Sequence, residues 1–143
     1  MVLQRVRRAS VRVDGEEVGR IGRGLLVLAG VERGDPSDAA TRAAHKLLHL
    51  RIFDDEARRM NRSVKDVGGQ VLLVSQFTLA ASTRRGRRPS FDAAAAPEEA
   101  EPLLEALAAA LRREGVEVAS GRFGATMEVE LVNDGPVTFV LEL

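Results

Sequence analysis

The stretch QVLLVSQFTLAAS, residues Gln70–Ser82, opens with one of the most apolar runs of the chain. A short continuous apolar run between turn-forming residues is typical of a strand that is buried on both faces. GLLVLAGV, residues Gly24–Val31, has the same character and is bounded by glycines. The two runs therefore predict two buried strands, the first over Gly24–Val31 and a longer one over Gln70–Ser82.

The segments around the first run predict a hairpin and a helix. Val11–Val13 and Glu16–Ile21 flank an Asp-Gly pair, which is the pattern of a β-hairpin. After the first buried strand, Asp35-Pro36 is expected to start a helix, with the proline at or near its first turn. Apolar side chains recur at helical spacing up to Leu50, so this helix is expected to bury one stripe.

A second helix is expected in APEEAEPLLEALAAALRREG, which has acids near its start, arginines at its end and Gly115 as its stop. RIF predicts a short strand, and VEVASGRFGATMEVELVNDGPVTFVLEL predicts two or three more. This order of elements predicts one mixed α+β domain over residues 1–143. Its core is expected to be a largely antiparallel, barrel-like sheet with two main helices.

Composition narrows the possible functions. The chain has no cysteine, which excludes disulfides, thiolate catalysis and zinc–thiolate sites. Its formal net charge is zero and its aromatic residues, 3% of the chain, are all phenylalanine, which argues against a general nucleic-acid coat or a stacking platform for bases. No secretory signal and no membrane-spanning run are apparent, so a cytoplasmic location is expected.

Polar residues interrupt the second apolar run at Ser75-Gln76-Phe77-Thr78. This is either the point where the strand leaves the core or a place where backbone N–H groups converge on a developing oxyanion. A hydroxyl here is a candidate nucleophile, but the sequence offers no base close to it.

Other polar clusters carry weaker indications. His45 and His49 lie four residues apart on the predicted helix, but without a third ligand they are more typical of ordinary helix residues than of a metal site. Asp54-Asp55-Glu56 is more typical of an acidic turn than of a cation site. Gly121 and Gly124 flank a phenylalanine without the context of a nucleotide fingerprint, so they indicate a strand entry or a turn beside a ligand.

Four arginines surround Gly86, just after the polar strand end: Arg84, Arg85, Arg87 and Arg88. A run of charge is usually a solvated surface, but guanidinium groups also suit phosphate. The residues leave both interpretations open.

The stretch Asn133-Asp134-Gly135-Pro136 separates two runs that both resemble β-strands. Each of these residue types favours turns, so a hairpin turn is the simpler interpretation. The alternative is a fixed peptide that presents backbone carbonyls to a ligand.

In order and character these pieces resemble the D-aminoacyl-tRNA deacylases, also called D-tyrosyl-tRNA deacylases. The resemblance runs from QRVRRASVRVDGEEVGRIGRGLLVLAGV through RIF, VLLVSQFTLAA, RRPSF and GRFGA to LVNDGPVTF. SQFTLA together with NDGPVT is its most specific part, and MNRSVKDVGG is the least typical stretch. The resemblance covers essentially the whole chain.

The resemblance implies a homodimer that cleaves the ester between a D-amino acid and the 3′-terminal ribose of tRNA, and that also acts on glycyl-tRNA. It implies a cis peptide at Gly135-Pro136 that reaches into the partner's pocket, holds the substrate amino group and leaves no room for an L side chain. SQFT is expected to line that pocket, so Ser75–Thr78 are the candidate catalytic residues, and Asn133 joins the chiral-selection group. No metal or other cofactor is implied.

Together these points predict water attack on the ester, with backbone N–H groups near Gln76 and Phe77 stabilising the oxyanion and the ribose 2′-OH assisting proton transfer. Thr78 is expected to organise the pocket, with a nucleophilic role as the minority alternative. The basic loop Arg84–Arg88 is expected to meet phosphates of the acceptor end. Two other functions remain open: a non-catalytic tRNA- or RNA-binding module, and an oligomer that binds a small molecule.

Overall fold

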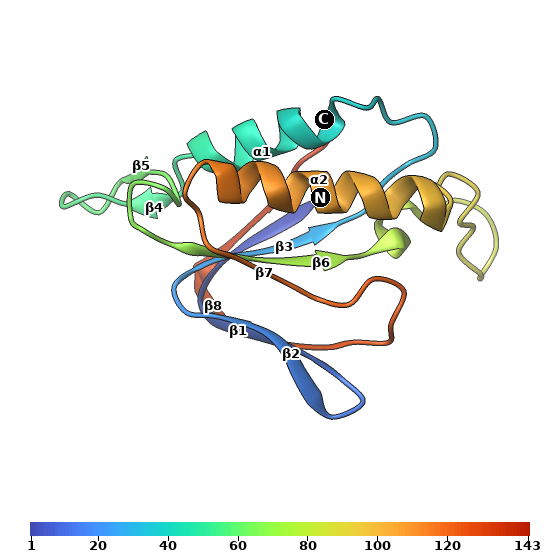
Figure 1. The fold of residues 1–143 in the computed structure, drawn as a ribbon, viewed down its shortest axis with the longest axis horizontal. Coiled ribbons are helices and arrows are strands. Elements are labelled where there is room, and N and C mark those ends of the chain that lie inside the picture. Colours follow the sequence, from blue (N-terminus) through green and yellow to red (C-terminus); the bar gives the residue numbers. More distant parts are fainter.

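The computed structural model covers residues 1–143 and contains two long helices packed on one face of a curved sheet (Figure 1). The helices are α1 (Ala39–His49) and α2 (Pro97–Arg113). The main sheet contains β1 (Val2–Val13), β2 (Glu16–Ile21), β3 (Gly24–Ala29), β6 (Gln70–Ser75), β7 (Val118–Ser120) and β8 (Glu128–Val140). A small separate sheet pairs β4 (Phe53–Asp54) with β5 (Met60–Arg62), and the short 3-10 helix η1 spans Phe77–Ala80. The predicted mixed α+β fold with two main helices is confirmed.

Three of the five strand pairs in the main sheet are antiparallel, which confirms a largely antiparallel sheet. The long strand β1 pairs with β2, β3 and β8, and the β1–β2 hairpin turns at Asp14-Gly15 as predicted. The order β3–β6–β7 is parallel. Each connection within it carries a helix, α1 in the first and α2 in the second, as parallel neighbours require.

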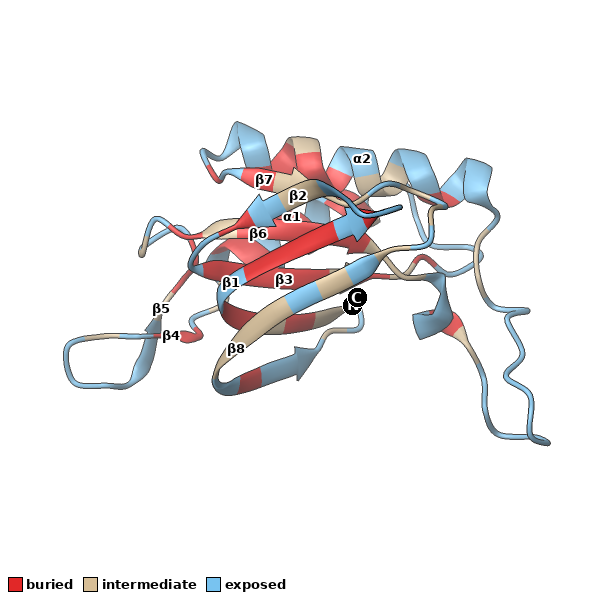
Figure 2. Ribbon diagram, turned by 90° about the horizontal axis from the view of Figure 1, so that it is seen from below, coloured by how far each residue is buried: buried red, intermediate tan, exposed pale blue.

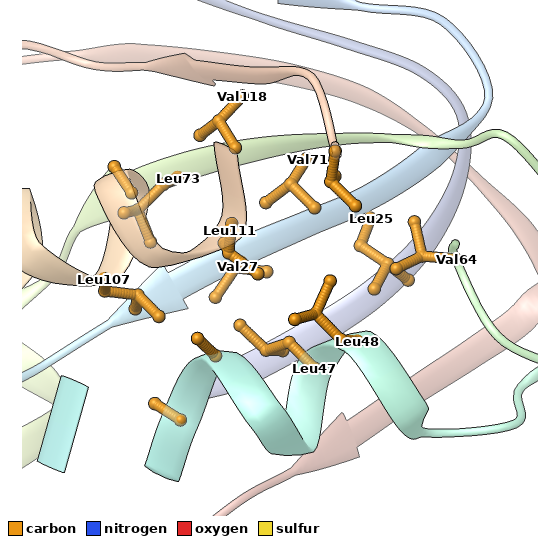
Figure 3. Packing of buried hydrophobic residues seen from close by; sticks show 14 of the residues in the cluster. Leu25, Val27, Leu47, Leu48, Val64, Val71, Leu73, Leu107, Leu111 and Val118 are labelled. Carbon is orange, nitrogen blue, oxygen red and sulfur yellow. The ribbon is translucent and has the colours of Figure 1, made fainter. Parts of the chain in front are cut away.

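The larger hydrophobic core lies between the two helices and the sheet (Figure 3). Alternate residues of the central strands face it, among them Leu25 and Val27 of β3 and Val71 and Leu73 of β6. The residues between them face the opposite side of the sheet, so both strands are buried on both faces. This confirms the interpretation of the two apolar runs.

A smaller core fills the concave side of the sheet, where β2 and β8 curve around it (Figure 2). It includes Val6 and Val11 of β1 and Leu72 of β6. Gly19 of β2 approaches β7 so closely that a Cβ there would lie 2.8 Å from the Ser120 carbonyl oxygen. The sheet is therefore nearly closed and barrel-like, as predicted.

The helix ends follow their local chemistry. The second helix begins at Pro97, carries glutamates in its first turn and arginines in its last, and ends before Gly115, as predicted. The first helix begins at Ala39, later than the expected start at Asp35-Pro36. There the Asp35 carboxylate accepts the Glu32 N–H at 2.9 Å, which holds a turn instead of a helix. Neither helix combines the length and apolarity that a bilayer crossing requires.

Candidate functional site

The three parallel strands end next to one another, β3 at Ala29, β6 at Ser75 and β7 at Ser120. The crevice outside the carboxyl ends of parallel strands is the usual ligand site of such sheets. A cavity of about 450 Å³ opens there, between the strand ends, the N-terminal half of α2 and the segment that leads into β8. Eleven of its sixteen lining residues are hydrophobic, so it suits a ligand with substantial apolar surface.

Ser75, Gln76 and Phe77 line this cavity, whereas Thr78 does not. The strand ends at Ser75 because Gln76 adopts φ −145° and ψ 78°, and η1 follows. The expected strand over Gln70–Ser82 is therefore wrong in its second half. The turn leaves the Phe77 ring 59% exposed at the cavity.

The turn also decides which backbone donors are free. The Gln76 N–H donates to the Ala29 carbonyl at 2.8 Å, so it is not available to an oxyanion, contrary to our expectation. The first N–H groups of a helix have no partner inside it, and in η1 these are Phe77 and Thr78. Any backbone oxyanion site at this strand end must therefore begin at Phe77.

The Thr78 side chain is exposed, and its Oγ1 accepts a hydrogen bond from Nε2 of Gln76. No histidine or carboxylate hydrogen-bonds to this hydroxyl. Both histidines lie on α1, where His49 Nδ1 contacts the His45 carbonyl at 2.7 Å, and neither lines the cavity. Because a threonine nucleophile needs a base, the geometry favours an organising role for Thr78.

Gly30 is a cavity residue that the sequence did not single out. A Cβ at this position would lie 2.8 Å from the Gln76 carbonyl oxygen and 3.2 Å from the Leu79 Cβ. The chain after β3 therefore packs directly against η1. The only sequence signal was a glycine that ends a buried apolar run.

The basic loop lies next to the cavity. Ser82 and Ser90 exchange both backbone hydrogen bonds, at 2.8 and 2.9 Å, and so close the loop between them. The Phe91 ring contacts Phe77 with centroids 5.1 Å apart. All four arginines are exposed and make no ion pair: Arg84, Arg85, Arg87 and Arg88. The loop therefore presents unpaired positive charge beside the Phe77 edge of the cavity.

The Gly-Pro segment is not a hairpin turn. Both of its flanks pair with β1 in the same direction, Thr138 with Gln4 and Asn133 with Val6. Four residues of β8 thus face a single residue of β1, so the segment 134–137 bulges out of the strand. The Gly135-Pro136 peptide is cis, as the resemblance implied.

Several contacts fix this bulge. The side-chain amide of Asn133 donates to the Val137 carbonyl at 3.0 Å and to the Arg5 carbonyl at 2.9 Å, so it bridges the base of the bulge and ties it to β1. Gly135 has φ +139°, and a Cβ there would lie 2.6 Å from Cγ2 of Val137. Only glycine fits this position without strain.

Arg5 of β1 contacts the base of the bulge, and the sequence did not indicate this role. Its Nε donates to the Asp134 carbonyl at 3.1 Å, and one terminal nitrogen donates to the Ile52 carbonyl at 2.8 Å. The same guanidinium lies 3.3 Å from carboxylate oxygens of Asp54 and of Asp134. Its side chain is only 8% exposed, so these contacts form in a largely water-free environment.

The acidic segment after RIF serves structural purposes. Asp54 pairs with Arg5, and Asp55 closes a turn by accepting the N–H groups of Ala57 and Arg59. These bonds, the one from Arg59 first, lower the pKa of Asp55. No cluster of three or more potential ligands is arranged to hold a metal ion.

Within one chain the predicted residues form two groups. Ser75, Gln76 and Phe77 line the cavity, with the arginine loop beside them. Gly135 and Pro136 are exposed and do not line it. The Gly-Pro segment and the cavity are therefore two separate groups within one chain.

Comparison with known proteins gives full-length matches. Residues 2–142 match the family model described as D-Tyr-tRNA(Tyr) deacylase. The chain is 60% identical to the D-aminoacyl-tRNA deacylase of Stutzerimonas stutzeri (strain A1501) over 141 residues, with 99% of this chain and 97% of the relative covered. It is 57% identical to the D-aminoacyl-tRNA deacylase of Ectopseudomonas mendocina (strain ymp) over 143 residues, with 100% and 99% covered.

Two solved structures have the same fold. A c-Myc DNA unwinding element binding protein superimposes with a TM-score of 0.93 at 41% identity, covering 99% of this chain and 97% of that one. A structure described as a probable eukaryotic D-amino acid tRNA deacylase superimposes with a TM-score of 0.82 over 96% and 95% of the two chains. The latter is 22% identical and is evidence for the fold alone.

Proposed function

Because this chain belongs to the D-Tyr-tRNA(Tyr) deacylase family, we propose that it hydrolyses the ester between a D-amino acid and the 3′-terminal ribose of tRNA. It is a hydrolase that releases the free D-amino acid and deacylated tRNA. The observation that carries the proposal is the largely apolar cavity at the end of β6, lined by Ser75, Gln76 and Phe77 and flanked by unpaired arginines. An aminoacyl-adenosine has apolar surface for such a cavity, and the arginines suit the phosphates that follow it.

The reaction proceeds by attack of water on the ester carbonyl. The N–H groups of Phe77 and Thr78 donate to the developing oxyanion, because Gln76 uses its own N–H within the fold. Collapse of the intermediate breaks the bond to the ribose 3′-oxygen, which leaves with a proton. The adjacent 2′-OH assists this transfer, since no protein base hydrogen-bonds to the hydroxyl of Thr78.

Chirality is selected by Gly135 and Pro136 of a second copy of the chain. Both residues protrude from β8 and are exposed in the single chain, while Asn133 and Arg5 fix the base of the bulge. The backbone carbonyls of the bulge hold the substrate amino group, and an L side chain clashes with the fixed main chain. Rejection by a clash achieves selectivity without any attractive contact to the correct side chain. Glycine has no side chain to reject, so glycyl-tRNA is also a substrate.

A homodimer is supported by exposed apolar side chains next to both halves of the site. Phe77 and Leu79 are exposed on η1, and Phe139 and Val140 are exposed on β8 just after the bulge. Apolar side chains gathered in this way mark surfaces that another chain covers. The tRNA acceptor end approaches along the loop Arg84–Arg88.

The deciding experiment measures amino acid release from matched D- and L-aminoacyl-tRNA by the purified protein. Cleavage of the D ester with the L ester spared is expected. Gly135→Ala is expected to reduce cleavage of the D ester or to relax selectivity, because the added Cβ displaces Val137 and with it the bulge. Gly68→Ala is the matched control, since Gly68 also has a positive φ, +61°, and lies outside the cavity.

Each alternative has its own outcome. If neither ester is cleaved but salt-sensitive tRNA binding depends on Arg84–Arg88, the chain is an RNA-binding module. If neither tRNA binding nor cleavage is found, the cavity serves another small ligand. If Gly135→Ala and Gly68→Ala change the cleavage of the D and L esters equally, the bulge does not select the substrate.

A further inference from the structure

A second cavity, of about 510 Å³, adjoins the first. It lies between α2 and the segment after β7, and Ser75, Leu104 and Phe123 line both cavities. A ligand that fills the first cavity can therefore extend into the second along α2.

Most residues that line the second cavity are polar or glycine, whereas most that line the first are hydrophobic. Glu101, Glu105 and Arg112 project into it from α2, at spacings of four and seven residues that share one face of a helix. Neither glutamate forms an ion pair or a side-chain hydrogen bond. Two free carboxylates therefore face the cavity.

Two arginines supply donors, one from each wall of this cavity. Arg122, from the segment after β7, lines the cavity and has no acidic partner. Arg112 donates one N–H to the Val118 carbonyl at 3.0 Å, which anchors the guanidinium and leaves its other donors free. The cavity thus offers both acceptors and donors, next to the proposed site of ester cleavage.

This combination matches the polar edge of cytosine. Its exocyclic N4 amino group donates, and carboxylates are its usual partners in proteins. Its ring nitrogen and carbonyl oxygen accept, and arginine supplies matching donors. Uracil places a carbonyl oxygen where cytosine has the amino group, so it would face the carboxylates with unfavourable charge.

Resting on the proposed function, we propose that the second cavity binds the penultimate nucleotide of the tRNA acceptor end, a cytosine. Every tRNA ends in the sequence CCA, so the nucleotide joined to the terminal adenosine is always a cytosine. Glu101 and Glu105 accept from its N4 amino group, and Arg112 and Arg122 donate to its acceptor edge or its phosphate. The enzyme thereby recognises a nucleotide beyond the reacting one without reading the body of the tRNA.

The test compares three substrates that carry the same D-amino acid. They are tRNA ending in CCA, the same tRNA ending in CUA, and a D-aminoacyl-adenosine that lacks the penultimate nucleotide. The protein is the full chain, as wild type, as the double variant Glu101→Gln and Glu105→Gln, and as the control Glu99→Gln. Glu99 lies on the same helix but does not line the cavity.

For the wild type, kcat/KM is expected to be about tenfold lower on the CUA substrate than on the CCA substrate, the size of effect that one good base contact provides. The double variant is expected to lose or reverse this preference, because a glutamine amide can donate to the uracil oxygen. It is also expected to lower the ratio of tRNA cleavage to adenosine-ester cleavage, whereas Glu99→Gln keeps the wild-type ratio and the preference for cytosine.

Two results overturn the inference alone. Equal cleavage of CCA and CUA substrates by the wild type would show that the base is not recognised, while cleavage of the D ester would leave the proposed function standing. If Glu99→Gln changes the cytosine preference as much as the double variant does, the preference does not arise from the second cavity. If the wild-type protein cleaves none of the three substrates, both the proposed function and this inference are overturned.

Discussion

Replacing Arg5 by methionine is expected to destabilise the chain and to disturb the Gly-Pro bulge. Methionine keeps much of the length of the side chain but removes every donor. The Asp134 and Ile52 carbonyls would lose their bonds from Arg5, at 3.1 and 2.8 Å. The carboxylates of Asp54 and Asp134 would lose their ion pairs, both at 3.3 Å.

The size of the effect follows from burial. Hydrogen bonds to a charged group contribute about 1.5–3 kcal/mol each, and removing one partner of a buried ion pair costs about 3–5 kcal/mol. Here Asp54 and Asp134 are 45% and 27% exposed, so water compensates part of their loss. We therefore expect the free energy of unfolding to fall by about 3 kcal/mol, which corresponds to about 6–12 °C in melting temperature.

Arg7 provides the matched control. It lies on the same strand and pairs with the same Asp134 carboxylate at 3.3 Å, but its side chain is 75% exposed. Arg7→Met is expected to cost about 0.5 kcal/mol or less, as exposed ion pairs do. Both variants and the wild type are unfolded by heat and by urea at one protein concentration, because association adds to apparent stability.

Activity completes the experiment. Arg5→Met is expected to lower the ratio of D- to L-ester cleavage at temperatures where the variant is still folded, and Arg7→Met to leave this ratio close to that of the wild type. Equal stability losses in the two variants would refute the reasoning from burial. A folded Arg5→Met protein with wild-type selectivity would show that the bulge keeps its position without this guanidinium.

Three further outcomes are expected. Gly30→Ala should lower kcat/KM by at least tenfold and should also lower the free energy of unfolding, because the added Cβ would lie 2.8 Å from the Gln76 carbonyl oxygen and the backbone at the cavity wall must shift. Unchanged steady-state kinetics would contradict this. Alanine at all four arginines of Arg84–Arg88 should raise KM for tRNA. The slope of log KM against log salt concentration should also become smaller, by about one unit for each phosphate that the loop no longer binds. Steady-state assays at several salt concentrations would measure both effects. Burial lowers the pKa of the Met1 ammonium from its usual value of 8.0, so just below pH 8 the unfolded chain binds more protons than the folded chain. The free energy of unfolding should therefore rise as the pH increases to 8. Urea titrations should show this rise, and acetylating the N-terminus should remove it.

The central strands and the second helix could be predicted because their signals are local. Continuous apolar runs mark β3 and β6 as buried on both faces, and the ends of α2 follow from Pro97, the first-turn glutamates and Gly115. The parallel pairing of β3, β6 and β7 was not predicted, because the spacing of apolar residues does not distinguish parallel from antiparallel neighbours in a buried strand.

The local error at SQFT has a physical cause. Phe77 and Leu79 are apolar, so the sequence pattern typical of a strand continues through them. In the structure both side chains are exposed on the 3-10 helix η1. Apolar side chains are also common on protein surfaces, so their presence in a sequence does not say whether they are buried in the same chain, covered by another chain or exposed. The same 3-10 turn, which the sequence did not predict, follows Gln76, whose N–H donates to the Ala29 carbonyl and is not free for an oxyanion.

Long-range contacts also lie beyond sequence patterns. Arg5 reads as one of several basic residues in an N-terminal strand, yet it bonds to Asp134, 129 positions away. The family resemblance implied a cis peptide at Gly135-Pro136, but not the buried arginine beneath it. The sequence therefore pointed to residues that line the cavity, but not to the contacts that hold the Gly-Pro bulge in position.

The division of the site between two groups of residues links assembly to chemistry. The large core between the helices and the sheet is formed by residues of one chain. Gly135 and Pro136 do not line the cavity of their own chain, and apolar side chains are exposed on η1 and at the end of β8. In the proposed dimer, each chain thus provides the cavity for one substrate and the chiral barrier for the other. In that dimer, a change in the bulge of one chain would act on its partner's reaction, and the residues that fix the bulge, Arg5 and Asn133, do not line the cavity of their own chain.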